Sequence, residues 1–326
     1  MTNWLTGWGY RRSHDISAQA GAGDHYQVCI KVYKSGTDNG TETVNGITAG
    51  KVSCDGHCRD DFGDIRFTDN DGDTLLDHWM ETLVSGTSAV FWVEVADSLE
   101  SATATIYVYY SKADATDVSN ITNTFLFGDD FSSGSSPDAS KWTVAGSPTV
   151  SGGICTLTAG QNIKGKTNVG PSGVCWHSRA NYESQANLTI GIHGLTDAAN
   201  EAEYYYMGEV KYARSIKAGS STVTTITIAV NTYHIFDIFC ISSSSVKFNE
   251  DGSQVAAHTT NITTTAIPVF HYSRTSYGPT VNVDYTFVRK YVSPEPVHST
   301  WGSQEAEVTI VIPTVTTQAA TLIEEY

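Results

Sequence analysis

Short stretches in which apolar and polar residues alternate recur along the whole chain, and this pattern restricts the fold more than any other feature. Between residues 25 and 33, every second residue from Tyr26 to Val32 is apolar, so these side chains lie on one face of a strand. Residues 89–95 and 103–110 have the same β-prone composition. Long amphipathic helix patterns are missing. Short strands separated by Gly, Asn, Asp and Ser turns are typical of antiparallel sandwiches and barrels.

A polar, turn-rich stretch at residues 111–122 divides the chain, and the strand pattern restarts at Phe125. A chain of 326 residues is long enough for two domains. Beyond Phe125, strands are predicted at residues 153–158, 186–192, 204–208, 222–230, 234–241 and 281–288, with a hairpin at residues 245–255. We therefore predict an all-β chain of two antiparallel β-sandwich, jelly-roll-like domains, residues 1–115 and 123–292, followed by a C-terminal β-prone tail, residues 293–326.

The net charge of −16 argues against nucleic acid and anionic membranes as partners, because both need clustered Lys and Arg. No stretch of about 18 apolar residues is present, so membrane insertion is not expected. The abundance of Ser, Thr, Gly, Asn and Tyr is typical of exported β-proteins. The N-terminus lacks the basic region and apolar core of a secretory signal. Either that signal has been removed or the chain leaves the cell by another route, such as virion assembly followed by lysis. We expect an extracellular, cell-surface or virion location.

Six cysteines permit three disulfides without establishing any. Cys54 and Cys58 are close enough in sequence to form a small loop, but they lack the second pair of ligands that a zinc site requires. Disulfides or free thiols are therefore favoured over a metal site.

Five segments of the first half resemble, in their order and their residues, an uncharacterised domain of archaeal and bacterial cell-surface proteins. These segments are residues 7–12, 61–76, 78–81, 91–95 and 106–110. The resemblance covers residues 5–115. That family has no established activity that carries over to particular residues.

Segments of the second half, residues 127–131, 140–143, 150–153, 246–252 and 283–291, are similar to concanavalin-A-like or laminin-G-like jelly-roll domains. This resemblance covers residues 125–292. It implies two stacked antiparallel sheets, often with a glycan or calcium at one rim. It transfers no binding residue, because the loops of such domains vary.

Calcium is the candidate cofactor, because carboxylates cluster around a glycine turn. The candidate ligands are Asp64, Asp69, Asp71 and Asp73. The segment resembles the start of a calcium loop, but Met80 stands at the twelfth position, where such a loop has Glu. The alternative is an acidic turn, in which Asp and Gly are favoured for backbone reasons alone.

Aromatic side chains stack on the apolar faces of sugars, and two clusters of them are candidate glycan-binding residues. These residues are Tyr204, Tyr205, Tyr206, Tyr212, Tyr272, Arg274 and Tyr277. Alternation along a strand sends some of them outward and the others into the core.

Glu201 and Glu203 are the candidate acids for glycoside hydrolysis, since they share one face of a strand. Concanavalin-like hydrolases carry a denser strand motif of alternating acids, and the third acid is missing here. A Gly-x-Ser-x-Gly elbow and a phosphate-binding Gly-rich loop are also missing. We therefore predict no enzymatic activity, with a polysaccharide-active hydrolase or lyase as the alternative.

The tail contains an apolar, β-prone segment, in which Val308, Ile310 and Ile312 are the candidate assembly residues. Such a strand either adds to a sheet edge of a neighbouring copy or folds back onto its own chain. The sequence therefore predicts a non-enzymatic structural or adhesion protein with glycan-binding capacity. Its expected partners are glycans and other copies of itself or neighbouring surface or virion subunits in a surface layer, filament or tail appendage.

Overall fold

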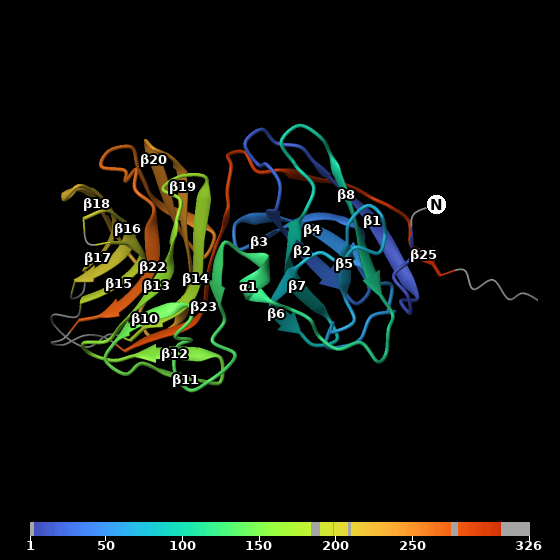
Figure 1. Ribbon diagram of the computed structural model, residues 1–326, viewed down its shortest axis with the longest axis horizontal. Coiled ribbons are helices and arrows are strands. Elements are labelled where there is room, and N and C mark those ends of the chain that lie inside the picture. Colours follow the sequence, from blue (N-terminus) through green and yellow to red (C-terminus); the bar gives the residue numbers. More distant parts are fainter. Residues whose placement is uncertain (1–2, 184–189, 198, 208–209, 275–279, 308–326) are drawn as a thin grey trace, which may run out of the picture.

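The computed structural model describes residues 3–183, 190–197, 199–207, 210–274 and 280–307, and it is built almost entirely of strands (Figure 1). Within these residues the single helix, α1 (Ile121–Thr124), has four residues and is capped by Asn120. The predicted all-β fold class is confirmed. No helix among the described residues is long and apolar enough to cross a membrane.

Two sheets form the N-terminal sandwich. One has the strand order β24-β1-β8-β5, with β25 also pairing with β1, and the other has the order β3-β4-β2-β7-β6. Neighbouring strands are antiparallel except β2 and β4, which are parallel. The strands are β1 (Tyr10–Ser17), β2 (Tyr26–Tyr33), β3 (Gly40–Val44), β4 (Ile47–Ser53), β5 (Arg66–Thr68), β6 (His78–Val84), β7 (Ser88–Val95), β8 (Ala104–Tyr110), β24 (Val297–Trp301) and β25 (Glu305–Ala306).

Two larger antiparallel sheets form the C-terminal sandwich. The seven-stranded sheet has the order β10-β13-β22-β15-β16-β17-β18, and the eight-stranded sheet has the order β11-β12-β23-β14-β19-β20-β21, with β9 pairing with β23. The strands of the seven-stranded sheet are β10 (Trp142–Ala145), β13 (Asn162–Val169), β15 (Ile190–Thr196), β16 (Glu201–Met207), β17 (Val210–Lys217), β18 (Ser220–Ile226) and β22 (Ile267–Ser273). Those of the eight-stranded sheet are β9 (Phe127–Asp129), β11 (Thr149–Ser151), β12 (Ile154–Leu157), β14 (Val174–Tyr182), β19 (Tyr233–Ser242), β20 (Ser245–Glu250), β21 (Ser253–His258) and β23 (Val281–Lys290).

The four sheets are stacked as layers, with the sheet containing β2 and β7 against the sheet containing β14 and β23 (Figure 1). An aromatic cluster fills the junction, and its members come from both sandwiches and from the linker. Trp92 of β7 packs against Phe287 of β23 with 5.5 Å between the ring centres. Phe125 of the linker stacks on Phe287 with 3.9 Å between the ring centres. Each such buried side chain contributes about 1.5–3 kcal/mol, so the two sandwiches share a hydrophobic interface.

A buried ion network lies in the same junction. Nδ1 of His177 lies 2.7 Å from Asp237, and its Nε2 lies 3.7 Å from Glu81 of β6, which belongs to the other sandwich. Trp92 and Tyr285 donate hydrogen bonds of 2.8 and 2.7 Å to the Glu81 carboxylate. Burial alone would lower the pKa of His177, but the two carboxylates raise it to about 9. The imidazolium therefore links the two sandwiches at neutral pH.

The chain after the second sandwich returns to the first, where β24 and β25 pair with β1. Nδ1 of His298 lies 2.8 Å from Nε2 of His14, and Trp301 stacks on His14 at 3.7 Å. Of the two alternatives for the tail, packing within the chain is therefore observed as far as Ala306. The candidate assembly residues Val308, Ile310 and Ile312 lie outside the described residues.

All six cysteines are buried and unpaired. Burial raises the pKa of Cys155 and Cys240 to about 12, so these thiols stay protonated at neutral pH. Free thiols are the alternative that the structure shows.

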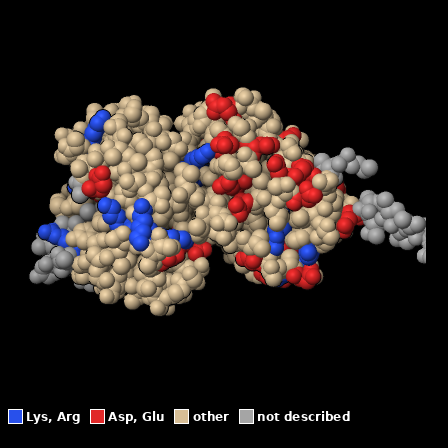
Figure 2. Space-filling model, in the orientation of Figure 1, with Lys and Arg blue, Asp and Glu red and all other residues tan. Residues whose placement is uncertain are grey.

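Acidic side chains gather over the N-terminal sandwich on the side of the molecule that Figure 2 shows. On the same side, the C-terminal sandwich carries scattered Lys and Arg between wide uncharged areas. The two sandwiches therefore present different electrostatic surfaces.

Candidate functional site

The outer face of the seven-stranded sheet carries the two carboxyl groups of β16. Ala202, Tyr204 and Tyr206 of this strand belong to the core cluster between the sheets. Alternation along the strand places Glu201, Glu203 and Tyr205 on the opposite face. The pair predicted from sequence therefore lies on the outermost layer of the molecule, away from the junction with the N-terminal sandwich (Figure 1).

Arg214 of β17 stands directly opposite Glu203 in the sheet register. Its Nε donates a 2.7 Å hydrogen bond to Oε1 of Glu203. Its Nη2 lies 2.9 Å from Glu201 and also contacts Glu203, and the guanidinium lies 4.1 Å from the ring centre of Tyr205. One cation therefore holds both carboxyl groups and covers them.

Glu203 is the more deeply buried acid, with 0% of its surface exposed compared with 6% for Glu201. Burial and the neighbouring Glu201 hold the pKa of Glu203 well above its usual range, against the opposing effect of Arg214. Oε2 of Glu203 is buried and has no hydrogen-bond partner. A protonated carboxyl group of this kind is suited to donate a proton.

The two carboxyl groups are close together, because oxygens of both contact the same Nη2 atom of Arg214. Inverting glycosidases place their two carboxyl groups about 6.5–9.5 Å apart, whereas retaining enzymes place them about 5–5.5 Å apart. The bridge by one nitrogen favours the shorter separation.

Aromatic side chains lie on the same face, on both sides of β16. Tyr205 faces Tyr212 of β17, with 6.3 Å between the ring centres. Two strands away, Phe270 and Tyr272 of β22 stack at 6.0 Å. The register through β15 sets Tyr272 on the same face as Tyr205. All four rings are half-buried, so each keeps some surface for a ligand.

The structure separates the other glycan-binding candidates from this group. Tyr204 and Tyr206 point into the core, and the Tyr204 hydroxyl donates to the backbone oxygen of Asn249 at 2.6 Å. Both are out of reach of a surface glycan, because alternation turns them inward. Arg274 is exposed, and Tyr277 lies outside the described residues.

The calcium candidates do not converge. Asp64 is fully buried and accepts hydrogen bonds from the backbone NH groups of Arg59 and Ser111, at 3.0 and 2.8 Å. Asp71 accepts hydrogen bonds from the backbone NH groups of Asp73 and Thr74. Among the described residues, Asp64, Asp69, Asp71 and Asp73 do not form a group of three ligands. In this arrangement these acids stabilise turns and a loop, and a calcium site in this segment stays a prediction.

A group that the sequence did not indicate joins His234, Glu250 and Asp251. Nδ1 of His234 lies 3.1 Å from Glu250 and 2.7 Å from Asp251. Burial raises the pKa of Glu250 to about 6. The hairpin turn at Asp251 was predictable from Asp-Gly, but its partner is 17 residues earlier in the chain, and no local pattern connects the two.

Comparisons with known proteins gave one family match and several similar solved structures. The family model "domain of unknown function (DUF2341)" matches residues 61–145, about a quarter of the chain, and overlaps the predicted uncharacterised domain. A connection with cell-surface proteins stays a prediction. The search of curated proteins gave no match.

Solved structures similar to this chain include several jelly-roll proteins named as glycosidases. One is a beta-1,3-glucanase from Mycobacterium marinum, at 18% identity and a TM-score of 0.42, covering 50% of this chain and 98% of that protein. Another is a glycosyl hydrolase family 16 protein from Mycobacterium smegmatis, at 15% identity and a TM-score of 0.43, covering 50% and 99%. A third is a beta-1,3-1,4-glucanase (lichenase) from a mouse hindgut metagenome, at 12% identity and a TM-score of 0.42, covering 51% and 99%.

These findings correct two predictions made from the sequence. The chain was expected to be a non-enzymatic structural or adhesion protein without enzymatic activity, whereas the similar structures are named as glycosidases. The alternative prediction, a polysaccharide-active enzyme of concanavalin-like fold, agrees better with those names. Identities of 12–18% indicate a likeness of fold only.

Proposed function

We propose that the C-terminal sandwich is the catalytic domain of a glycoside hydrolase that acts on a polysaccharide through Glu201 and Glu203. The observation that carries the proposal is the pair of carboxyl groups bridged by Arg214 on the outer sheet face. One cation balances one carboxylate, and a second negative charge in this buried site is unfavourable, so the pair holds a proton. One carboxylate beside one carboxylic acid is the combination that glycoside hydrolysis requires.

In the proposed reaction, Glu203 donates its proton to the glycosidic oxygen as the bond from that oxygen to the anomeric carbon breaks. A carboxylate oxygen of Glu201 forms a bond to the same carbon. Water then attacks this carbon, the bond to Glu201 breaks, and the proton of the water returns to Glu203. The short separation of the two carboxyl groups supports this two-step course, which retains the anomeric configuration.

Substrate has to move Arg214 from its place over the carboxyl groups. The guanidinium side chain is 21% exposed, whereas the side chains of Glu201 and Glu203 are 8% and 0% exposed.

The outward position after Glu203 is Tyr205, where denser hydrolase motifs continue with an acid. Proton transfer is therefore assigned to Glu203 alone.

The four half-buried rings support a glycan as the substrate class, since sugars stack on aromatic faces. Beta-1,3- and beta-1,3-1,4-glucans are the first polymers to test, because they are the substrates in the names of the similar structures. Our proposal places the site of action outside the cell, where a polymer too large to be taken up is met.

The test is the release of reducing ends from a panel of polysaccharides by the parent protein and by the Glu203→Gln variant. Glu100→Gln is the matched control, because Glu100 is exposed and its side chain accepts a hydrogen bond from the Gly21 backbone, far from the proposed site in sequence and fold. Activity in the parent and control that is lost in Glu203→Gln supports the proposal. Equal activity in all three proteins refutes it.

A further inference from the structure

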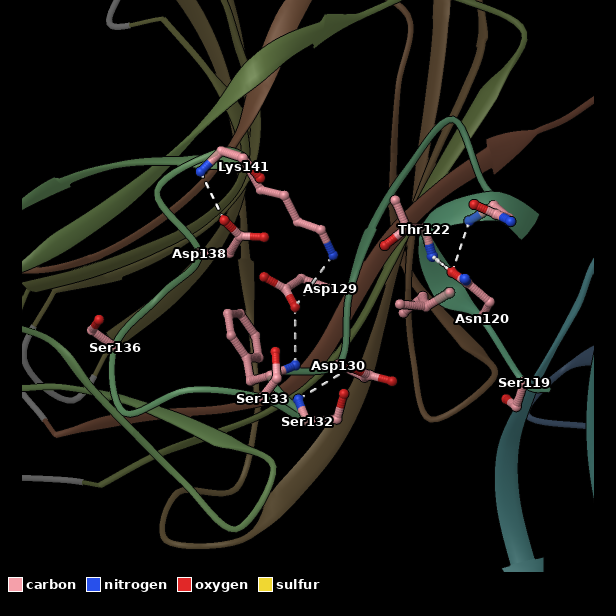
Figure 3. Close-up of a pocket in the computed structure, with 14 residues that line it drawn as sticks. Ser119, Asn120, Thr122, Asp129, Asp130, Ser132, Ser133, Ser136, Asp138 and Lys141 are labelled. Carbon is pink, nitrogen blue, oxygen red and sulfur yellow. Dashed lines mark hydrogen bonds and ion pairs between the residues drawn. The ribbon is translucent and has the colours of Figure 1, made fainter. Parts of the chain in front are cut away.

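A polar pocket of about 520 Å³ lies where the two sandwiches meet (Figure 3). One wall is the linker around Asn120 and Thr122, and the other wall is the loop from Asp129 to Lys141. Hydroxyl, amide and carboxylate groups make up most of the lining. The volume lies within the range of about 300–1,000 Å³ that small-molecule sites occupy.

An ammonium and a carboxylate stand next to each other in this pocket. Nζ of Lys141 donates a 2.9 Å hydrogen bond to the backbone oxygen of Gly128 and lies 3.6 Å from Asp129. Asp129 is itself fixed by Trp142 Nε1 at 2.6 Å and by the backbone NH of Phe131 at 3.1 Å. An ammonium carries three protons, and the hydrogen bond to Gly128 uses one of them. The contact with Asp129 is an ion pair beyond hydrogen-bond distance. Among the described residues, the pair is therefore held in place with two N–H donors left for a ligand.

Strand β6 of the N-terminal sandwich holds two of the lining residues in place. Trp79 of β6 donates from Nε1 to Asp130 at 3.3 Å, and the backbone NH of Ser132 donates to the other Asp130 oxygen at 3.2 Å. On the linker side, Ser119 Oγ accepts the backbone NH of Met80 at 2.8 Å. The pocket in this form thus depends on the docking of the N-terminal sandwich.

The lining favours a neutral ligand rich in hydroxyl groups. Three Asp and a single Lys disfavour an anion. Within the described part of the chain, the three carboxylates do not form a group of metal ligands. Neighbouring hydroxyls of a sugar both donate and accept hydrogen bonds, so an ammonium beside carboxylates suits them.

We propose that this interdomain pocket is a saccharide-binding site, separate from the Glu201–Glu203 face. It binds one sugar unit of a neutral glycan by hydrogen bonds to Lys141 and Asp130 and to the serine hydroxyls around them. The proposal rests on the proposed function only for the choice of probe. It assigns a binding role to the contact between the two sandwiches.

The experiment is calorimetric titration of the Glu203→Gln protein with a beta-1,3-linked glucose trisaccharide and, separately, with the beta-1,4-linked one. On this background, Lys141→Met removes the donor, and Ser132→Tyr fills the pocket without removing a side-chain hydrogen bond. Lys217→Met, on the exposed end of β17, is the control. Thermal melting of each variant confirms that it is folded.

We expect Lys141→Met to weaken binding by about tenfold or more, as for the loss of a hydrogen bond to a charged group. We expect Ser132→Tyr to weaken binding at least as much, because its ring occupies the space of the ligand. The control should bind within about twofold of the background protein. If binding is unchanged in Ser132→Tyr but lost in Tyr205→Ala, the ligand binds to the outer sheet face and the proposal is overturned. The proposal is also overturned if neither trisaccharide shows saturable binding. Because binding is measured without turnover, an inactive parent protein would refute the proposed hydrolase and leave this result standing.

Discussion

Arg214 donates a 2.7 Å hydrogen bond from Nε to Oε1 of Glu203, a carboxyl group without exposed surface. The same guanidinium reaches Glu201 and stacks on Tyr205. In the resting protein this arrangement balances the charge of the one ionised carboxylate in a pair that holds a proton. It also means that any ligand of the outer sheet face competes with Arg214 for the carboxyl groups.

We expect Arg214→Met to lower the free energy of unfolding by about 3–5 kcal/mol at pH 7, because it leaves the ionised carboxylate of the buried pair without its cation. The loss should be smaller at pH 4, where the carboxyl groups of the variant are more fully protonated. Urea denaturation at both pH values measures this. Lys211→Met in the same strand is the control. An equal loss at the two pH values would contradict the assigned electrostatic role.

The buried His177 predicts a decrease in stability at alkaline pH. Its pKa is raised to about 9 in the folded protein from an ordinary value of 6.5, so its stabilising contribution is complete below about pH 6.5 and is lost as the pH rises through 9. The contribution is on the order of 3 kcal/mol. Thermal melting between pH 6 and 10 should show the decrease, and His177→Gln should flatten it. The same slope in the variant would contradict this assignment.

Four buried histidines predict the opposite trend in acid. The pKa of His271 and His14 is lowered to about 3 and that of His298 to about 4, mainly by burial, and the pKa of His193 is lowered further below its usual range. The unfolded chain binds protons at these sites below about pH 6.5, whereas the folded chain does not. Stability should therefore fall as the pH decreases from about 6.5 towards 3. Chemical denaturation across this range measures it, and His271→Phe should reduce the slope. A slope equal to that of the parent would contradict the assignment.

Gly50 of β4 provides the space for the His14–His298 pair. A Cβ at this position would lie 2.8 Å from Nδ1 of His298 and 3.2 Å from Nε2 of His14. We expect Gly50→Ala to destabilise the protein by about 1–3 kcal/mol through overpacking. Gly40→Ala in the same sheet is the control, because nothing lies within 4 Å of a Cβ there. Urea denaturation measures the stability of the two variants. Equal stability of Gly50→Ala and Gly40→Ala would contradict the proposed overpacking.

Alternation was sufficient to predict strands with an apolar face. The pattern from Tyr26 gave β2, and Asp-Gly gave the hairpin of β20 and β21. Strand β1 was missed, because its polar side chains are buried against distant partners: Arg11 binds Glu305, and His14 contacts His298. Such contacts connect residues almost 300 positions apart, and no local pattern shows them.

The candidate site was predictable in part for the same reason. Residues two apart on a strand share a face, so Glu201 and Glu203 were found as a pair. Which of the consecutive tyrosines faces outward depends on the core, and only the packed sheets show that it is Tyr205. The role of Arg214 depends on the register of β17 against β16, which the sequence does not fix. The interdomain pocket depends on how two sandwiches dock.

The most direct test of Glu203 as proton donor compares two substrates with the Glu203→Gln variant: a beta-glucan, and a dinitrophenyl glycoside of the same oligosaccharide. The dinitrophenolate leaves without protonation, so only the polymer needs the acid. We predict that the variant loses about 10²–10⁴-fold of kcat/KM on the glucan and far less on the dinitrophenyl glycoside. An equal loss on both substrates, or glucan turnover as fast as that of the parent, would contradict the assignment of Glu203.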